Sequence, residues 1–179
     1  MDEAKLQHML DRLEIQDVVH RYARGLDRHD DEVLRSVFHE DAIDNHGPWV
    51  GGREPFVEWA NGPCHEHTNA HLHQITTHTC EIDGDTAHTE SYCQWVHRLK
   101  EEPTVTVGGG RYVDRLEKRD GEWRIVVRRL VVDFYFEAQG TIFSSPTMAE
   151  YPNGTWDTTD ISYERPLGIP DDVLAKRVG

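Results

Sequence analysis

The stretch DGEWRIVVRRLVVDF (residues 120–134) decides how the second half of the chain folds. It opens with Asp120-Gly121, a dipeptide typical of tight turns, and continues with branched and aromatic residues typical of β-strands. Similar turn signals recur upstream, at Asp83-Gly84-Asp85 and at Glu101-Glu102-Pro103. Strands joined by short turns pair in antiparallel fashion, so the sequence predicts a meander of four strands, over residues 70–82, 86–99, 104–117 and 122–137.

The first forty residues have a helical pattern instead. Apolar side chains recur every three or four positions and predict an amphipathic helix, which Gly25 and the run Asp27–Asp31 should end. A shorter helix with Asp30 or Asp31 as its N-cap, a short strand over 42–46 and a third helix in GGREPFVEWA (51–60) complete this half. The apolar stripe of the first helix comprises Leu6, Met9, Leu10, Leu13, Ile15, Val18, Val19, Tyr22 and Leu26.

Helices followed by a meander predict an α+β fold, a cone-shaped barrel of N-terminal helices packed on a strongly bent, mainly antiparallel sheet. A cavity between the helices and the sheet is a natural ligand site. We assign residues 1–142 to this domain. Residues 143–179 are a C-terminal extension rich in Ser, Pro, Thr, Asn and Gly. Its large aromatics favour a flap over the pocket or a contact with another subunit; a plain surface tail is the alternative.

The composition excludes several classes of protein. The net charge of −14 argues against nucleic acid or anionic membranes as partners, because both require a basic surface. No apolar run approaches the about 18 residues of a membrane span, and the N-terminus lacks the apolar stretch of a signal peptide, so we expect a cytoplasmic protein. The widely spaced Cys64, Cys80 and Cys93 predict free thiols.

The segment CHEHTNAHLHQ (64–74) raises the question of a metal site. His71 and His73 alternate along a strand and therefore share a face, as a chelating pair would. Neither HExxH nor a pair of thiolates accompanies them, so we expect no metal and no cofactor. Capping of strand and loop ends accounts for His65, His67 and His78. The glycines at 108–110 open no helix, so they indicate a strand bend or a close backbone approach to a ligand, and no dinucleotide site.

Residues 15–27, IQDVVHRYARGLD, place Tyr22 and Asp27 on the first helix. Residues five apart diverge by about 140° in a regular helix, so both could face one cavity only if the helix loosens near Gly25. A carboxylate at a helix C-terminus is unfavourable with the helix dipole. A histidine across the cavity would offset this cost; the alternative is that Asp27 simply caps the next helix.

In these motifs and in the order of its elements, the chain resembles the SnoaL-like branch of the nuclear-transport-factor-two superfamily. The resemblance rests on RLEIQDVVHRYARGLDRHD (12–30) and on the last strand, and it covers roughly residues 5–140. Scytalone dehydratase, bile-acid 7α-dehydratase and hexachlorocyclohexane dehydrochlorinase belong to this superfamily. The resemblance implies a bent sheet wrapped by helices around a cavity, and an acid–histidine pair that falls on Asp27 and His73.

The resemblance also implies further site residues. Tyr22 matches a tyrosine of the dehydratases, and Arg128 matches an arginine of the last strand, although only one of Arg128 and Arg129 should enter the cavity. The second acid of the bile-acid enzyme has no clear counterpart; Glu90 and Tyr92 lie nearest. The residues expected to contact substrate are Asp44, His46, Trp59 and Tyr92.

The predicted chemistry is an elimination without a cofactor. Asp27 would orient His73, His73 would remove a proton, Tyr22 would donate to the leaving group, and Arg128 would stabilise the developing negative charge. The expected substrate is a small hydrophobic hydroxylated compound (aromatic, alicyclic or steroid-like) that loses water, halide or a small carbon fragment such as formaldehyde. A double-bond isomerase with the same pair and a non-catalytic ligand-binding module are the alternatives. We expect a homodimer or homotrimer, formed through the exposed sheet face.

Overall fold

The computed structural model describes residues 2–101, 103–140, 145–146, 148 and 151–174. Helices and short strands come first: α1 (Glu3–Asp27), α2 (Asp31–Ser36), β1 (Phe38–His46), β2 (Trp49–Gly52), α3 (Arg53–Ala60) and the 3-10 helix η1 (Pro63–His65). Long strands follow: β3 (Thr68–Asp83), β4 (Thr86–Leu99), β5 (Thr104–Arg119) and β6 (Glu122–Gln139). The extension carries η4 (Ile161–Tyr163) and α4 (Asp171–Leu174). The expected order of elements is confirmed, with β2 and η1 added.

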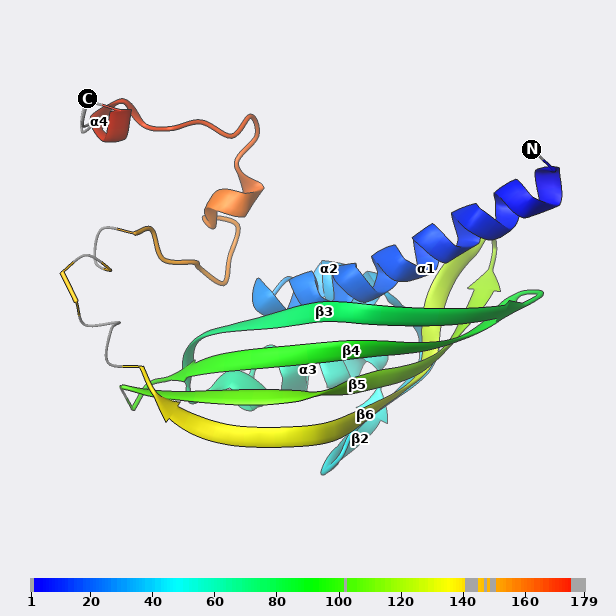
Figure 1. Cartoon of the computed structure of the whole chain (residues 1–179), viewed down its shortest axis with the longest axis horizontal. Coiled ribbons are helices and arrows are strands. Elements are labelled where there is room, and N and C mark those ends of the chain that lie inside the picture. Colours follow the sequence, from blue (N-terminus) through cyan, green and yellow to red (C-terminus); the bar gives the residue numbers. More distant parts are fainter. Residues whose placement is uncertain (1, 102, 141–144, 147, 149–150, 175–179) are drawn as a thin grey trace.

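The strands form one six-stranded sheet in the order β2-β1-β6-β5-β4-β3 (Figure 1). Each pairing is antiparallel except that of β1 with β6, so the predicted meander is confirmed as the larger part of the sheet. The sheet curls strongly, but its edge strands β2 and β3 do not pair with each other. The cone is therefore open along one side.

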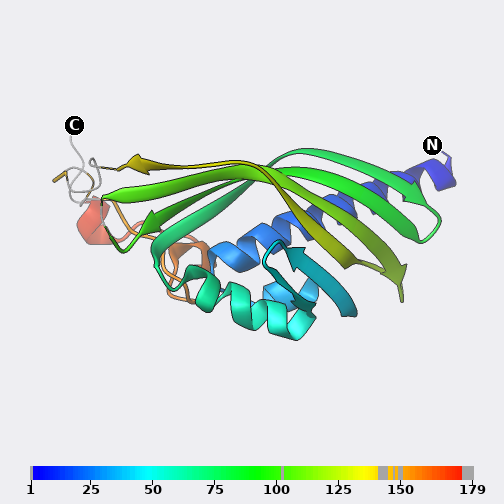
Figure 2. The same cartoon turned by 90° about the horizontal axis from the view of Figure 1, so that it is seen from below.

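All three N-terminal helices lie on the concave face of the sheet (Figure 2). The core between the two layers is rich in aromatic side chains, because Tyr22 and Phe38 pack with Phe56, Tyr112 and Trp123. None of the helices in the described ranges is long and apolar enough to cross a lipid bilayer. The α+β prediction, with helices on a single face of a bent sheet, is confirmed.

The apolar stripe of helix α1 is buried over only part of its length. Its second half is buried from Ile15 to Leu26, as the apolar stripe predicts. In its first half, Asp11 and Arg12 hydrogen-bond Trp123 and Cys80 of the sheet, but the apolar side chains are exposed, Leu6 by 43% and Leu13 by 61%. Periodicity gives the apolar face of a helix but not which part of that face is packed.

The glycine run of β5 makes room for neighbouring side chains. A Cβ on Gly108 would lie 2.2 Å from the Trp95 ring, and one on Gly109 would lie 2.3 Å from Phe134. At Gly110 the β5–β6 pairing shifts register, and a Cβ there would meet the Val131 carbonyl oxygen at 2.0 Å. The close approach expected at these glycines comes from the protein's own residues.

Candidate active site

A histidine on β3 and an aspartate at the end of α1 form the centre of the candidate site. The Nδ1 atom of His73 lies 2.8 Å from Asp27 Oδ1, and the backbone N–H of His73 donates to Asp27 Oδ2 at 3.0 Å. Both side chains are largely buried, being 8% and 15% exposed. These hydrogen bonds compensate the carboxylate for its position at the helix C-terminus. They also require the proton of a neutral His73 to sit on Nδ1, which leaves a lone pair on Nε2.

The free side of His73 borders a cavity of about 240 Å³ between the helices and the sheet. No Lys, Arg, Asp or Glu side chain is among the residues that line it, and aromatic rings form much of the wall. Asp27 instead borders a separate groove on the other side of His73, beside Arg24 and Arg28. The cavity is lined by Tyr22, Leu26, His46, Pro48, Phe56, Trp59, Ala60, Cys64, His65, His73, Trp95, His97, Tyr112 and Leu130.

Tyr22 and Asp27 reach the site without any loosening of the helix. Helix α1 stays α-helical through Asp27 without loosening near Gly25, and Tyr22 and Asp27 accordingly border different cavities. Tyr22 borders the cavity on the side of the core. Asp27 takes part in the site through its contact with His73 on β3. Tyr22 has no accessible surface, and burial raises the pKa of its hydroxyl well above the ordinary value. Its hydroxyl oxygen lies 3.4 Å from His46 Nε2.

Asp44 and His46 lie together at the end of β1. Residues two apart on a strand point to the same side, and here His46 Nδ1 makes a very short hydrogen bond to Asp44 Oδ1. The Asp44 side chain is 2% exposed, and that of His46 is 12% exposed and borders the cavity. Of the two, only His46 is in a position to contact a ligand.

Arg128 is buried, whereas its neighbour Arg129 is exposed. Its guanidinium makes two hydrogen bonds to Asp114, at 2.8 and 2.6 Å. It also stacks between the rings of Tyr22 and Tyr112, at 3.8 and 4.3 Å from their centroids. Arg128 is not among the lining residues, so its expected direct role at a developing negative charge is corrected: it supports the tyrosines from behind.

The two aromatic residues expected to contact substrate have different positions. Trp59 lines the cavity and stacks on Trp49 at 5.1 Å. Tyr92 is 44% exposed on the outer face of the sheet, because Ser91 and Cys93 on either side of it point inward. The assignment of Tyr92 to the binding site is therefore wrong. Glu90 likewise points away from the cavity and pairs with Arg111.

The histidine cluster has two parts. His67 is exposed beside Glu66, whereas His65 and His71 are buried and stack at 3.8 Å with an interplanar angle of 22°. His65 Nδ1–H donates to the Ala60 carbonyl at 2.6 Å, and His71 Nε2–H donates to the Leu26 carbonyl at 3.0 Å. These bonds hold the loop after α3 and the end of α1 against β3.

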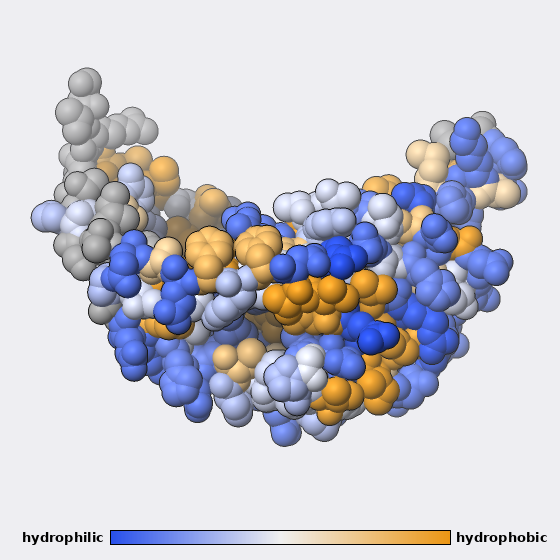
Figure 3. Space-filling view, turned by 60° about the horizontal axis from the view of Figure 1, so that its bottom comes forward, coloured by the Kyte–Doolittle hydropathy of each residue, from blue (hydrophilic) through white to orange (hydrophobic). Residues whose placement is uncertain are grey.

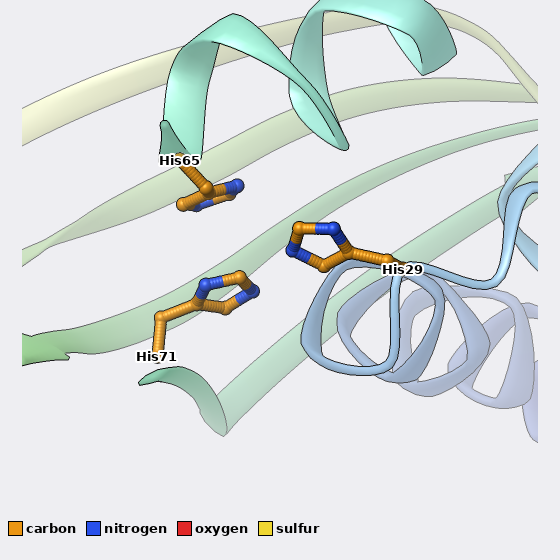
Figure 4. A group of neighbouring side chains, drawn as sticks. All are labelled: His29, His65 and His71. Atoms are coloured by element: carbon orange, nitrogen blue, oxygen red, sulfur yellow. The ribbon is translucent and has the colours of Figure 1, made fainter. Parts of the chain in front are cut away.

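His29 joins this pair, and Figure 4 shows the three rings gathered between α1, η1 and β3. One nitrogen of each ring lies within 4.8 Å of the others. Zinc–nitrogen bonds are about 2.0–2.1 Å long, and the lone pair of an imidazole lies in the plane of its ring. The nearly parallel planes of His65 and His71 point their lone pairs side by side, so one ion could bind both only after a ring turns.

Burial keeps several of these histidines neutral. It lowers the pKa of His71 to about 2, that of His65 to about 3 and that of His97 to about 4. Uncharged imidazoles allow the cluster to pack as aromatic rings beside the cavity. Protonation of any of them in the folded protein is therefore costly.

The C-terminal extension docks on the end of α1. Trp156 stacks on His29 at 4.1 Å, and Asp160 pairs with Arg28 at 2.7 Å. The hydroxyl of Tyr163 donates to Asp30 Oδ2 at 2.6 Å. Trp156 does not line the cavity, so a flap over its mouth stays a prediction. The expected domain boundary at 142–143 lies outside the described residues.

Sequence reasoning missed several residues of the cavity wall. Trp95, His97 and Tyr112 come from the middle of β4 and β5, and Leu130 from β6. Trp95 and Tyr112 are buried, and the alternation of buried and exposed positions along the strands would have selected them as inward-facing. His97 and Leu130 are only partly buried, so burial selects them less clearly.

Comparisons with known proteins agree with this fold. A profile of the SnoaL-like domain matches residues 7–129. The chain matches no curated protein by sequence. A hexachlorocyclohexane dehydrochlorinase from Novosphingobium barchaimii superposes with a TM-score of 0.72 at 21% identity, over 79% of this chain and 99% of that one.

Two further solved structures are similar. For a scytalone-dehydratase-like protein from Novosphingobium aromaticivorans, the TM-score is 0.66 at 21% identity, over 72% of this chain and 88% of that one. For a protein of unknown function from Mycobacterium tuberculosis, it is 0.64 at 32% identity, over 74% and 77%. At about 21% identity, the likeness to the two Novosphingobium proteins shows the fold alone.

Proposed function

This chain belongs to the SnoaL-like domain family, as its sequence resemblance indicated, and on that premise we propose that it is a lyase of the elimination type. His73 is the general base and Asp27 orients it. The substrate is a small, uncharged, mainly apolar molecule with a leaving group next to an acidic C–H bond. Solved structures of a dehydrochlorinase and of a dehydratase-like protein on the same fold support this class of reaction.

The observation that carries the proposal is the double contact between Asp27 and His73. One carboxylate oxygen holds the ring nitrogen, and the other holds the backbone of the same residue. This arrangement fixes both the tautomer and the direction of the ring, as the acid of a catalytic triad does. The remaining nitrogen, Nε2, is left for the cavity, where an unhydrated base is most effective.

The proposed reaction starts when His73 Nε2 takes a proton from carbon. The electrons of the C–H bond form the new double bond, and the bond to the leaving group on the adjacent carbon breaks. Asp27 stabilises the imidazolium that forms on His73 without itself taking the proton. A general base of this kind contributes about 10²–10⁴-fold to the rate.

The cavity wall supports an uncharged substrate. With no Lys or Arg among the lining residues, a carboxylate or phosphate would lose its hydration without gaining a counter-ion. Trp59, Trp95 and Phe56 provide flat apolar surfaces suited to an aromatic or alicyclic ring. The volume of about 240 Å³ suits one or two fused rings better than a full steroid.

The test uses cyclic β-hydroxy ketones such as 3-hydroxycyclohexanone, whose dehydration gives a conjugated enone that is followed by ultraviolet absorbance. Exchange of the α-deuterium of labelled cyclohexanone in water reports proton removal alone. We expect His73→Ala to lower both rates by about 10²–10⁴-fold. The exposed His67→Ala is the matched control and should retain both.

Two outcomes would contradict the proposal. Near-full activity of His73→Ala on any substrate that the wild type eliminates would exclude His73 as the base. Exchange of α-deuterium with migration of a double bond, and no release of a leaving group from any member of the panel, would indicate the isomerase instead. Chromatography of the products separates these cases.

A further inference from the structure

We infer that His46, oriented by Asp44, is the general acid that protonates the leaving group, in place of Tyr22. This inference rests on the proposed function and deepens it. The site then has two acid–histidine pairs whose histidines border one cavity. His73–Asp27 comes from β3 and α1, whereas His46–Asp44 comes from β1, which is separated from β3 by three strands of the sheet.

Accessibility separates the two candidates for the acid. Tyr22 has no accessible surface, so a ligand in the cavity cannot reach its hydroxyl as the side chains stand. The His46 side chain keeps 12% of its surface exposed and borders the same cavity. Its Nε2 atom lies 3.4 Å from the Tyr22 oxygen, a long contact that a substrate hydroxyl can replace or bridge.

Asp44 binds the ring of His46 in the same way as Asp27 binds the ring of His73. Each carboxylate binds the Nδ1 atom of its histidine and leaves Nε2 for the cavity. The rings of Phe56 and Trp59, at 5.3 and 5.8 Å, keep His46 in place. When His46 is protonated, its Nε2 carries a proton and the buried carboxylate on Nδ1 stabilises the cation, which is the arrangement that a proton donor requires.

A second observation indicates that this pair is more than a strand-end contact. Asp44 Oδ2 and Arg128 Nη1 are buried and have no hydrogen-bond partner within the described part of the chain. The two residues are paired across β1 and β6. Buried unpaired polar atoms are costly and rare, so their retention here points to a role for the charge of Asp44.

The proposed step is balanced. His73 Nε2 accepts the proton from carbon, the C=C bond forms and the C–O bond breaks. The departing oxygen takes the Nε2 proton of a protonated His46 and leaves as water. His46 ends neutral and His73 ends protonated, and exchange with solvent restores both. Tyr22 is a positioning residue, whose hydroxyl contacts Nε2 of His46 and limits the rotation of its ring.

The test compares two leaving groups that give the same product. 3-Hydroxycyclohexanone must be protonated on oxygen to lose water, whereas 3-acetoxycyclohexanone loses acetate without a proton. We expect His46→Gln to lower the ratio of the water rate to the acetate rate by about 10²–10⁴-fold. Asp44→Asn should lower this ratio in the same direction. The exposed His67→Gln should leave the ratio unchanged.

Several outcomes would overturn the inference. An equal fall for both probes would make His46 a binding or structural residue. A change of the ratio by Tyr22→Phe and not by His46→Gln would return the acid role to Tyr22. Failure of the proposed function is recognised separately, by His73→Ala retaining α-deuterium exchange or by the wild type acting on neither probe.

A measurement that needs no turnover accompanies these assays. In protein labelled with ¹⁵N-histidine, saturating cyclohexanol should shift the Nε2 resonance of His46, which His46→Gln identifies. Asp44→Asn should abolish the downfield Nδ1–H signal of the same ring. A His46 spectrum that responds neither to the alcohol nor to Asp44→Asn would also overturn the assignment.

Discussion

Asp27 binds His73 twice, through the ring at 2.8 Å and through the backbone at 3.0 Å, and so fixes the base relative to both α1 and β3. Asp27→Asn would retain a backbone contact but would offer Nδ1 an amide in place of a charge. We expect the elimination rate to fall by about 10²–10⁴-fold with little change in substrate binding. Steady-state kinetics with isothermal titration of cyclohexanone checks this. A rise in KM with an unchanged kcat would contradict it.

The buried pair of Arg128 and Asp114 should be costly to break. Both side chains are 0% exposed, so Arg128→Met leaves an unpaired carboxylate in the core. We expect the free energy of unfolding in urea to fall by about 3–5 kcal/mol. Replacing both partners, by Arg128→Met and Asp114→Leu, should restore most of the loss. The exposed Arg129→Met is the control, and an equal effect of the two arginine variants would contradict the prediction.

Acid should destabilise the fold through its buried histidines. Burial lowers the folded-state pKa of His71 to about 2, of His65 to about 3 and of His97 to about 4, whereas the unfolded value is about 6.5. The unfolded chain therefore binds more protons below pH 6.5. Stability is fully present above that pH and is lost as the pH falls towards 4. Each histidine contributes a slope of about 1.4 kcal/mol per pH unit.

Urea titrations at several pH values between 7.5 and 4.5 measure this slope. His97→Gln should reduce the slope by the contribution of one histidine, whereas the exposed His67→Gln should not change the slope. A free energy of unfolding that stays constant from pH 7 to 5 would show that these rings are not held neutral.

The outer side of the sheet should mediate self-association. Phe134 and Phe136 of β6 are each about half exposed, and they are in register with Gln94 and Val96 of β4, which alternate with the inward-facing Trp95. Figure 3 shows the side of the molecule on which β2 and β6 lie, with apolar side chains gathered there. We propose a dimer or trimer through this surface. Light scattering at micromolar concentration should give a multiple of 20.7 kDa.

Introducing charge into this surface provides the control. Phe134→Glu combined with Phe136→Glu should yield monomers. Leu167→Glu changes an exposed apolar residue of the extension and should leave the assembly intact. A monomeric wild type would contradict the proposal.

The docked segment around Asp160 should stabilise the end of α1. Asp160 is 6% exposed and accepts hydrogen bonds from Arg28 and from the backbone of Thr155 and Ser162. Hydrogen bonds from Ser162 and Thr155 and the charge of Arg28 lower its pKa, although burial opposes them. Asp160→Ala should lower the free energy of unfolding by about 1–3 kcal/mol and speed proteolysis of the extension. Thr158→Ala, at an exposed position of the same segment, should do neither.

The sequence alone determined the strands, the helices and their order. Turn residues such as Asp120-Gly121 and the period-2 alternation of β-strands are local signals, since each depends only on neighbours along the chain. The resemblance carried by residues 12–30 and 120–134 then predicted that Asp27 and His73 form a pair. The fold places them in contact.

Only the tertiary structure decided which side chains face the cavity. A register shift between Arg115 and Leu116 makes Asp114, and not Val113, the partner of Arg128, and no local pattern predicts such a bulge. The hydroxyl of Tyr22 is inaccessible to a ligand because Arg128 and three aromatic rings pack around this side chain. His46 can contact a ligand because β1 ends beside the cavity. Burial depends on which residues pack from distant parts of the chain, whereas periodicity depends only on near neighbours in sequence.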